Sequence, residues 1–152
     1  MALNCGPALD AVESKLGTLG VFDTVNMHEP ENAPGTGVTA SVWVEAIRPI
    51  PRASGLPVTS SVVDLSIRIQ RSMQTNPQNQ IDRDMAAATD AVINAFSGDF
   101  DLGGSVSHVD LLGAYGPSLS ARAGYLKQDS ITFRVMVVTV PLVFFDVWTQ
   151  VS

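Results

Sequence analysis

Cysteine is nearly absent from this chain of 152 residues, which contains only Cys5. A disulfide within the chain is therefore impossible, which agrees with a reducing compartment without requiring one. The two histidines, His28 and His108, are far apart in the sequence, so the common structural zinc sites lack ligands. We expect no metal site, and Cys5, which has no second cysteine nearby, is interpreted as an incidental thiol.

Charge is also scarce, and its balance is acidic. Charged residues make up 16% of the chain, and the formal net charge is −6 at pH 7. Ordinary domains carry about 25% charged residues. An acidic chain argues against nonspecific nucleic-acid binding, which depends on basic patches. Together with a hydrophobic content of 45%, the low charge excludes a disordered chain and indicates surface that partner proteins cover.

The chain has no hydrophobic run of membrane-spanning length. The most apolar stretch, Val135–Phe145, contains Thr139 and Pro141 and is 11 residues long, whereas a membrane helix needs about 20. Its β-branched content predicts a buried strand. The N-terminus also lacks a basic start followed by an apolar core, so we expect no signal peptide, no membrane partner and a cytoplasmic protein.

Sequence motifs of enzymes are missing as well. The chain contains neither a G-x-S-x-G nucleophile turn nor a G-x-x-x-x-G-K-[ST] phosphate loop. Asp99 and Asp101 could offer oxygen ligands to a cation, but an EF-hand would need other residues where Gly103 and Asp110 stand. A helix end followed by a solvated turn is the favoured interpretation. We expect no catalytic residue, no cofactor and no enzymatic activity.

Two helices are predicted by apolar spacing. Leu9, Val12 and Leu16 recur at steps of three and four, which predicts a short helix that Gly17 or Gly20 ends. A second, central helix follows Asn79 or Gln80 and ends at Gly98; its apolar stripe consists of Ile81, Met85, Ala88, Val92 and Phe96.

Strands occupy most of the remaining chain. Residues 38–47 predict one strand, with Val38, Ala40, Val42, Val44 and Ala46 on one face and Trp43 and Ile47 on the other. Residues 58–71 predict a second, with a dry face and a polar face that carries Asp64, Ser66, Arg68 and Gln70. The turn-rich link between them, Arg48–Pro57, predicts a long hairpin with an extended tip.

Further strands are expected around 21–27 and over 105–112, 119–127 and 131–140. Pro141 lacks a backbone donor and therefore marks a bend, a bulge or an edge, after which the chain stays apolar to its end. The order of elements predicts an α+β fold, an antiparallel or mixed sheet with the short N-terminal helix and the central helix packed on one face. We expect residues 1–152 to form a single domain.

Four of the nine basic residues, namely Arg48, Arg52, Arg68 and Arg71, fall within 24 positions around the predicted hairpin. Two interpretations remain open. These arginines belong to a solvated sheet face with cross-strand ion pairs, or they form a docking surface for an acidic partner. Aromatic residues are not interleaved with them, which disfavours a nucleic-acid surface.

The order of segments over residues 8–150 resembles the tail terminator proteins of long-tailed, siphovirus-type bacteriophages. No strict motif carries this resemblance; the succession does. The segments are 25–30 with Pro34, Gly35 and Gly37, then 42–50, 62–69, the central helix with 90–92 and Phe96, and the closing strand pair 123–127 and 133–141.

The resemblance implies a structural virion protein in the tail or neck, made in the host cytoplasm during assembly. Tail terminators form a ring, commonly a hexamer, on the head-proximal end of the tail tube. The ring ends tube polymerisation and offers a docking surface to the head–tail connector protein. DNA passes through the lumen without specific binding, which an acidic ring favours because like charges repel phosphates. The alternatives are another connector, neck or tail-tube protein and, less in keeping with the motifs, an enzyme or small-ligand module.

Residues that bind the tail tube or the connector are expected in loops, because loops on a rigid scaffold usually carry recognition. The segments concerned are 29–37 and 48–57, with the adjoining hairpin arginines and the apolar C-terminal segment. The expected partner-binding residues are Glu29, Glu31, Arg48, Arg52, Arg68, Arg71 and Trp148.

Overall fold

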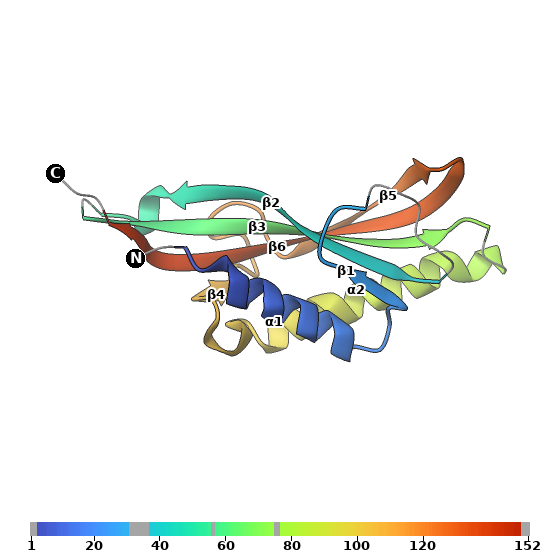
Figure 1. Cartoon of the computed structure of the whole chain (residues 1–152), viewed down its shortest axis with the longest axis horizontal. Coiled ribbons are helices and arrows are strands. Elements are labelled where there is room, and N and C mark those ends of the chain that lie inside the picture. The colour runs from blue at the N-terminus through green and yellow to red at the C-terminus, as the bar shows by residue number, and fades with distance from the viewer. Residues whose placement is uncertain (1–2, 31–36, 56, 75–76, 150–152) are drawn as a thin grey trace.

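The fold is built on one six-stranded sheet (Figure 1). A computed structural model describes residues 3–30, 37–55, 57–74 and 77–149. The strand order is β1-β2-β3-β6-β4, and β5 pairs with the same edge of β6 as β4 does. The strands are β1 (Thr24–Asn26), β2 (Thr39–Ile50), β3 (Val58–Ser72), β4 (His108–Val109), β5 (Ser120–Gln128) and β6 (Ile131–Thr149). Because β1 and β2 are parallel and the other pairs antiparallel, the expected mixed sheet is confirmed.

Two helices cover one face of this sheet, which completes the expected α+β fold (Figure 1). The first, α1 (Cys5–Thr18), buries Ala8, Val12 and Leu16. The second, α2 (Ile81–Gly98), buries the predicted stripe of Ile81, Met85, Ala88, Val92 and Phe96, together with Thr89. Helix spacing in the sequence thus predicted which side of each helix meets the core.

The centre of the sheet is β3, which lies between β2 and β6. Its helix-facing side chains, Val63, Leu65, Ile67 and Ile69, are each at most 1% exposed. The predicted hairpin is confirmed: β2 returns into β3 through a short 3-10 helix, η1 (Pro51–Ala53), which forms the tip. Because residues 61–70 of β3 pair with β2 on one side and β6 on the other, the middle of the hairpin is held within the sheet.

Strand β6 runs for 19 residues and contains the apolar run Val135–Phe145, which is therefore a strand as predicted. No helix in the described ranges is long and apolar enough to cross a membrane. Pro141 lies in the middle of β6, where its carbonyl accepts the N–H of Asp110 at 3.0 Å. The ring nitrogen therefore points to the same side of β6. At this position β6 has no partner strand, because β5 pairs with it only up to Thr139 and β4 pairs with it only from Leu142 onwards. Pro141 thus marks an edge and costs no hydrogen bond to β3.

Two details of the strand predictions are wrong. A register shift between Val44 and Ala46 leaves Glu45 as an extra residue, so Ala46 lies opposite Asp64 and Ile47 opposite Val63. Paired residues share a face, so the bulge moves Ala46 to the back face and Ile47 to the helix side. The strand expected over 105–112 contains only the two residues of β4, because the chain around β4 bends to follow β6.

The polar face of β3 is not solvated. Asp64, Ser66, Arg68 and Gln70 are all at most 9% exposed. Their neighbours on this back face of the sheet are Trp43 and Glu45 of β2, Thr139 of β6 and the loop that follows Asp110. Alternation along the strand was predicted correctly, but alternation does not indicate whether the polar side meets water or other side chains.

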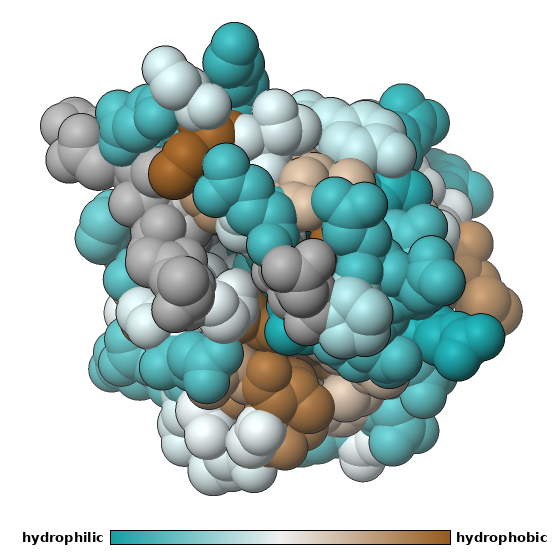
Figure 2. All heavy atoms as spheres, turned by 90° about the vertical axis from the view of Figure 1, so that its right-hand side faces the viewer, coloured by the Kyte–Doolittle hydropathy of each residue, from teal (hydrophilic) through white to brown (hydrophobic). Residues whose placement is uncertain are grey.

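The two ends of the elongated molecule differ in character. The end that carries the β5–β6 turn and the start of α2 is mostly hydrophilic in surface view (Figure 2). At the other end, the hairpin tip η1 meets the end of β6 (Figure 1). This second end is where the aromatic side chains of His108, Tyr115 and Phe145 gather, as described below.

We predict that truncating the central strand will cost far more stability than the same change on the surface. Leu65→Ala removes a side chain that is 0% exposed and should lower the free energy of unfolding by about 2–5 kcal/mol. Leu112→Ala, at a side chain 93% exposed, should change it by less than about 0.5 kcal/mol. Urea unfolding at low protein concentration measures both, and equal effects would contradict the assignment of β3 as the core.

Candidate functional site

The candidate site is a cluster of side chains at the tip end of the sheet, which we call the tip surface: Arg52, His108, Tyr115 and Phe145. The ring centroids of His108 and Phe145 are 5.5 Å apart, and Tyr115 meets Phe145 edge-on at 6.3 Å. The guanidinium carbon of Arg52 lies 5.6 Å from the centre of the Tyr115 ring. Aromatic residues and arginine are the side chains most enriched where proteins bind one another.

Tyr115 is positioned by a loop folded around one carboxylate. Asp110, 3% exposed, accepts backbone N–H groups from Gly113 (3.0 Å), Ala114 (2.8 Å) and Tyr115 (2.9 Å). Three charge-assisted hydrogen bonds to one side chain fix a segment that has no secondary structure of its own. The start of the loop is also attached to β6, because the backbone N–H of Asp110 donates a hydrogen bond to the carbonyl oxygen of Pro141.

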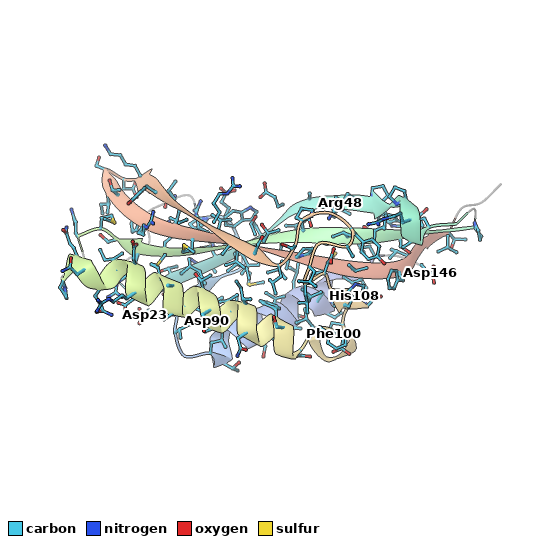
Figure 3. All side chains as sticks on the ribbon, turned by 180° about the vertical axis from the view of Figure 1, so that it is seen from behind. Asp23, Arg48, Asp90, Phe100, His108 and Asp146 are labelled. Carbon is cyan, nitrogen blue, oxygen red and sulfur yellow. The ribbon has the colours of Figure 1, made fainter. Side chains whose placement is uncertain are left out.

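Arg48 fastens the same loop to the back face of the sheet. Its Nε donates to Asp64 Oδ2 at 2.9 Å, and its Nη1 donates to the carbonyl oxygen of Tyr115. A Cβ on Gly116 would lie 2.8 Å from Arg48 Nη2 and would displace the guanidinium, and the φ of 135° at this position also favours glycine. Figure 3 shows Arg48, His108 and Asp146 in the same half of the sheet.

A β-bulge in β6 follows the pair of Phe144 with Ser61, the last regular pair before the register shifts. The register with β3 shifts between Thr59 and Ser61, and Asp146 adopts a positive φ of 56°. Backbone N–H groups at the bulge donate to side chains, Phe145 to Ser107 Oγ at 3.1 Å and Asp146 to Ser60 Oγ at 3.0 Å.

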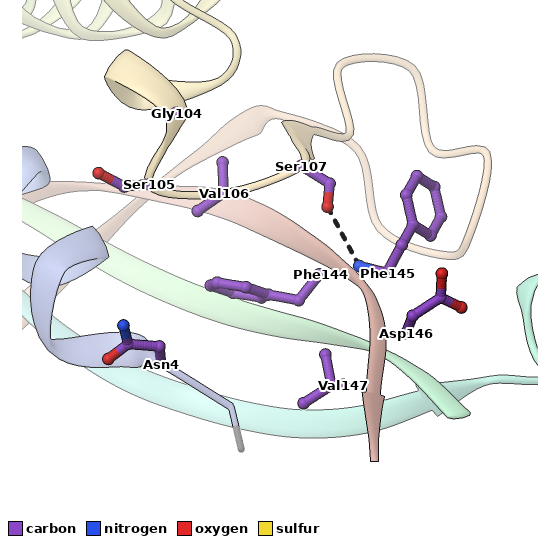
Figure 4. A pocket seen from close by; sticks show the side chains of 9 residues that line it. All are labelled: Asn4, Gly104, Ser105, Val106, Ser107, Phe144, Phe145, Asp146 and Val147. Atoms are coloured by element: carbon purple, nitrogen blue, oxygen red, sulfur yellow. Dashed lines mark hydrogen bonds between the residues drawn. The ribbon is translucent and has the colours of Figure 1, made fainter. Parts of the chain in front are cut away.

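The two adjacent phenylalanines face different ways, as consecutive residues of a strand do (Figure 4). Phe144 is 8% exposed and packs in the core, whereas Phe145 is 41% exposed. A shallow hollow of about 240 Å³ lies beside the bulge, and Asn4, Val106, Phe144 and Val147 are among its lining residues. Strand alternation therefore exposes one aromatic ring while the other stays in the core.

The remaining hairpin arginines are occupied within the chain. Arg71 pairs with Asp84 of α2. Arg68 is 9% exposed, stacks over the Trp43 ring at 5.2 Å, and lies 3.8 Å from Glu29 Oε1. Burial lowers the pKa of the Arg68 guanidinium, and the Glu29 carboxylate opposes that shift. The contacts of Arg68 join the back face to the loop that carries Glu29, whereas Arg71 joins the helix side of β3 to α2.

Of the residues expected to bind partners, some are exposed and others are engaged in contacts within the chain. Arg52 is exposed on the tip surface, and Trp148 lies half-buried near it, opposite Thr59. Glu29 is exposed, whereas Arg48, Arg68 and Arg71 form intramolecular ion pairs. Glu31 lies outside the described residues. Partner binding by these seven residues stays a prediction.

Sequence reasoning missed His108 and Tyr115. The signal that was available is the pair Gly113 and Gly116, both with positive φ, around an aromatic residue. Such a loop displays a side chain while its glycines allow the backbone to turn. Its position beside the hairpin tip depends on contacts across the sheet and could not be read from the sequence.

The chemistry available at this surface is that of contact between proteins. Within the described ranges, no three histidine, cysteine or acidic side chains gather where they could hold a metal ion. Asp99, considered above as a cation ligand, instead pairs with Lys15 at 2.9 Å and accepts the N–H of Gly103. These hydrogen bonds lower the pKa of Asp99, the one from Lys15 most strongly. Cys5 is half-buried, and burial raises the pKa of its thiol, which disfavours the reactive thiolate.

Comparison with known proteins gives a structural likeness. No protein family matches the chain, and no curated protein matches it. Among solved structures, the chain is similar to a chain of a "Virion of native gene transfer agent (GTA) particle", at 16% sequence identity and a TM-score of 0.43. The alignment covers 89% of this chain and 92% of that one. A likeness at this level carries no argument, so the function has to be argued from this chain's own residues.

We predict that Asp110→Asn will loosen the loop that carries Tyr115. The substituted amide keeps the size of the side chain but loses the charge that three N–H groups share, so stability should fall by about 1–3 kcal/mol. Hydrogen exchange at Gly113, Ala114 and Tyr115 should accelerate at least tenfold. Asp90→Asn, at an exposed position of α2 (Figure 3), is the matched control. Unchanged exchange in the loop would contradict the role of Asp110.

Proposed function

We propose that this chain is a structural virion protein of a tailed bacteriophage, and specifically a tail terminator. Copies of the chain assemble into a ring, commonly of six, on the head-proximal end of the tail tube. The ring ends tube polymerisation and then receives the head–tail connector protein. The protein acts in the tail or neck of the virion, reaches it from the host cytoplasm, and needs no catalytic residue or cofactor.

The tip surface is the observation that carries this proposal. It consists of the exposed Phe145 ring, the half-buried rings of His108 and Tyr115, and the exposed Arg52. Asp110 and Arg48 hold the loop that carries Tyr115. A preorganised surface binds with little ordering cost, which suits contact with a rigid tube. The resemblance over residues 8–150 supports the particular role, because the extended hairpin tip on which Arg52 lies is part of it.

The acidic composition supports passage of DNA through such a ring. Each chain contributes a net charge of −6, and most of its arginines are neutralised by ion pairs within the chain. A ring of like charge repels phosphates and leaves few free cations to hold them.

We predict that Arg52→Glu will prevent capping without preventing self-assembly. Reversing the only charge on the tip surface should lower the fraction of capped tubes at least tenfold, because arginine at an interface centre is a frequent binding determinant. Negative-stain imaging of purified tail tubes measures capping, and light scattering measures assembly. Arg83→Glu, an exposed change near the start of α2 at the opposite end, should leave both unchanged.

Wild-type outcomes separate the terminator from its alternatives. Closed rings, or single caps on tube ends, are expected for a terminator. Open-ended tubes made by this chain alone would instead assign it as a tail-tube subunit. A ring that binds the connector but ignores tubes would indicate another neck protein, and a monomer that binds neither would overturn the virion assignment.

We also predict weak binding of the assembled ring to double-stranded DNA. At about 0.15 M salt the Kd should exceed about 100 μM, at or beyond the weak end of ordinary nonspecific binding. Fluorescence anisotropy with a labelled duplex measures this value. Submicromolar affinity would contradict a lumen through which DNA slides.

A further inference from the structure

Both lateral edges of the sheet are open within the described part of the chain. Of the 12 residues of β2, Thr39–Ser41 pair with β1, and the outer edge from Val42 to Ile50 has no strand beside it. On the other side, the nine residues of β5 pair only with β6. Unpaired strand edges present N–H and C=O groups that readily accept another strand.

The β2 edge is accompanied by a hollow of about 370 Å³ between this strand and α1. Its floor is largely apolar, and two exposed acids of α1, Asp10 and Glu13, stand at its rim. Val44, 39% exposed, lies where the hollow meets the strand. The full lining consists of Gly6, Leu9, Asp10, Glu13, Met27, Val42, Trp43 and Val44.

The β5 edge carries side chains that complement this hollow. Tyr125 is 66% exposed and lies opposite Arg134, which reaches Asp82 of α2, so Tyr125 is on the helix side of the sheet. Lys127, two residues further, shares that side, whereas Arg122 points to the back face.

Charge distinguishes the two edges. Five of the chain's basic side chains have acidic partners within 4 Å, namely Lys15, Arg48, Arg68, Arg71 and Arg134. Arg122 and Lys127 of β5 have none among the described residues, and neither do Asp10 and Glu13 beside β2. The uncompensated charges are therefore positive on one edge and negative beside the other.

We infer that the β5 edge of one copy of this chain pairs with the β2 edge of the next, so that the sheets join across the subunit boundary. Tyr125 enters the hollow beside α1, and Lys127 faces Asp10 and Glu13. On the back face, Arg122 lies on the same side of the joined sheet as Glu45. This interface rests on the proposed ring and names the surfaces that form it.

A contact between two different edges is head-to-tail, which is the type that closes into rings. Two β5 edges pairing with each other would bring Arg122 and Lys127 of both copies together, and like charges disfavour that arrangement. Two β2 edges pairing with each other would likewise bring Asp10 and Glu13 of both copies together, and these like charges disfavour that arrangement. Charge thus favours the mixed pairing over either symmetric one.

The test uses two charge-reversed full-length chains. The edge variant carries Arg122→Glu and Lys127→Glu, and the rim variant carries Asp10→Lys and Glu13→Lys. Each places like charges at its own contact and should weaken self-association at least tenfold in sedimentation from 1 μM to 1 mM. An equimolar mixture should assemble, because the acidic edge of one variant then meets the basic rim of the other, and vice versa.

Tyr125→Ala tests the apolar part of the contact separately. Loss of the ring should weaken self-association at least tenfold, whereas Phe100→Ala, at an aromatic side chain 53% exposed on the turn after α2, should not. Circular dichroism confirms folding of each variant. Tyr125 is exposed, so its removal leaves the core intact.

The outcomes distinguish this inference from the proposed function. Edge and rim variants that assemble like the wild type, or a mixture that fails to assemble, would overturn the edge pairing while leaving tube capping to be judged independently. A wild-type chain that stays monomeric at every concentration and on tube ends would overturn it too. Assemblies that depend on both edges yet never cap tubes would confirm the pairing and contradict the terminator role.

Discussion

The pairing of β3 with β6 is the constraint on which the remaining structure depends. These strands of 15 and 19 residues run side by side along the sheet, and every other strand except β1 pairs with one of them. Leu65 and Val140, paired across them, lie in the core that α1 and α2 cover. Because loop closure must precede this pairing of distant segments, the sheet and the helices that cover it are expected to form cooperatively.

On the back face, buried polar residues position a loop through specific hydrogen bonds and ion pairs. Asp64 is buried and takes Arg48 as its partner, and the same guanidinium reaches the backbone of Tyr115. A buried carboxylate left alone would be costly, so the pair and the loop depend on each other. Asp110 is likewise a buried carboxylate that fixes the loop, because it accepts hydrogen bonds from three backbone N–H groups. The Tyr115 ring of the tip surface is thus positioned by the contacts that its loop makes with Arg48 and Asp110.

The two ends and the two lateral edges of the molecule differ in character, which suits head-to-tail assembly. One end is mostly hydrophilic (Figure 2). The other carries the aromatic rings and Arg52, and the two lateral edges differ in charge. Isolated exposed apolar side chains are ordinary, but open edges with an adjoining apolar hollow are normally protected in monomers. The 16% charged content agrees with a chain whose surface is partly covered by other proteins.

The sequence by itself determined the elements whose signal is local. Helix spacing placed Val92 and Phe96 in the core, alternation defined the two faces of β3, and Pro141 marked an edge. The tertiary structure decided the rest: the bulge at Glu45, the burial of the polar face and the clustering of Tyr115 with the hairpin tip. These features depend on contacts such as that of Arg48 with Tyr115, which are 67 residues apart. Periodicity records only which side a residue faces, and what covers that side is set by distant segments of the chain.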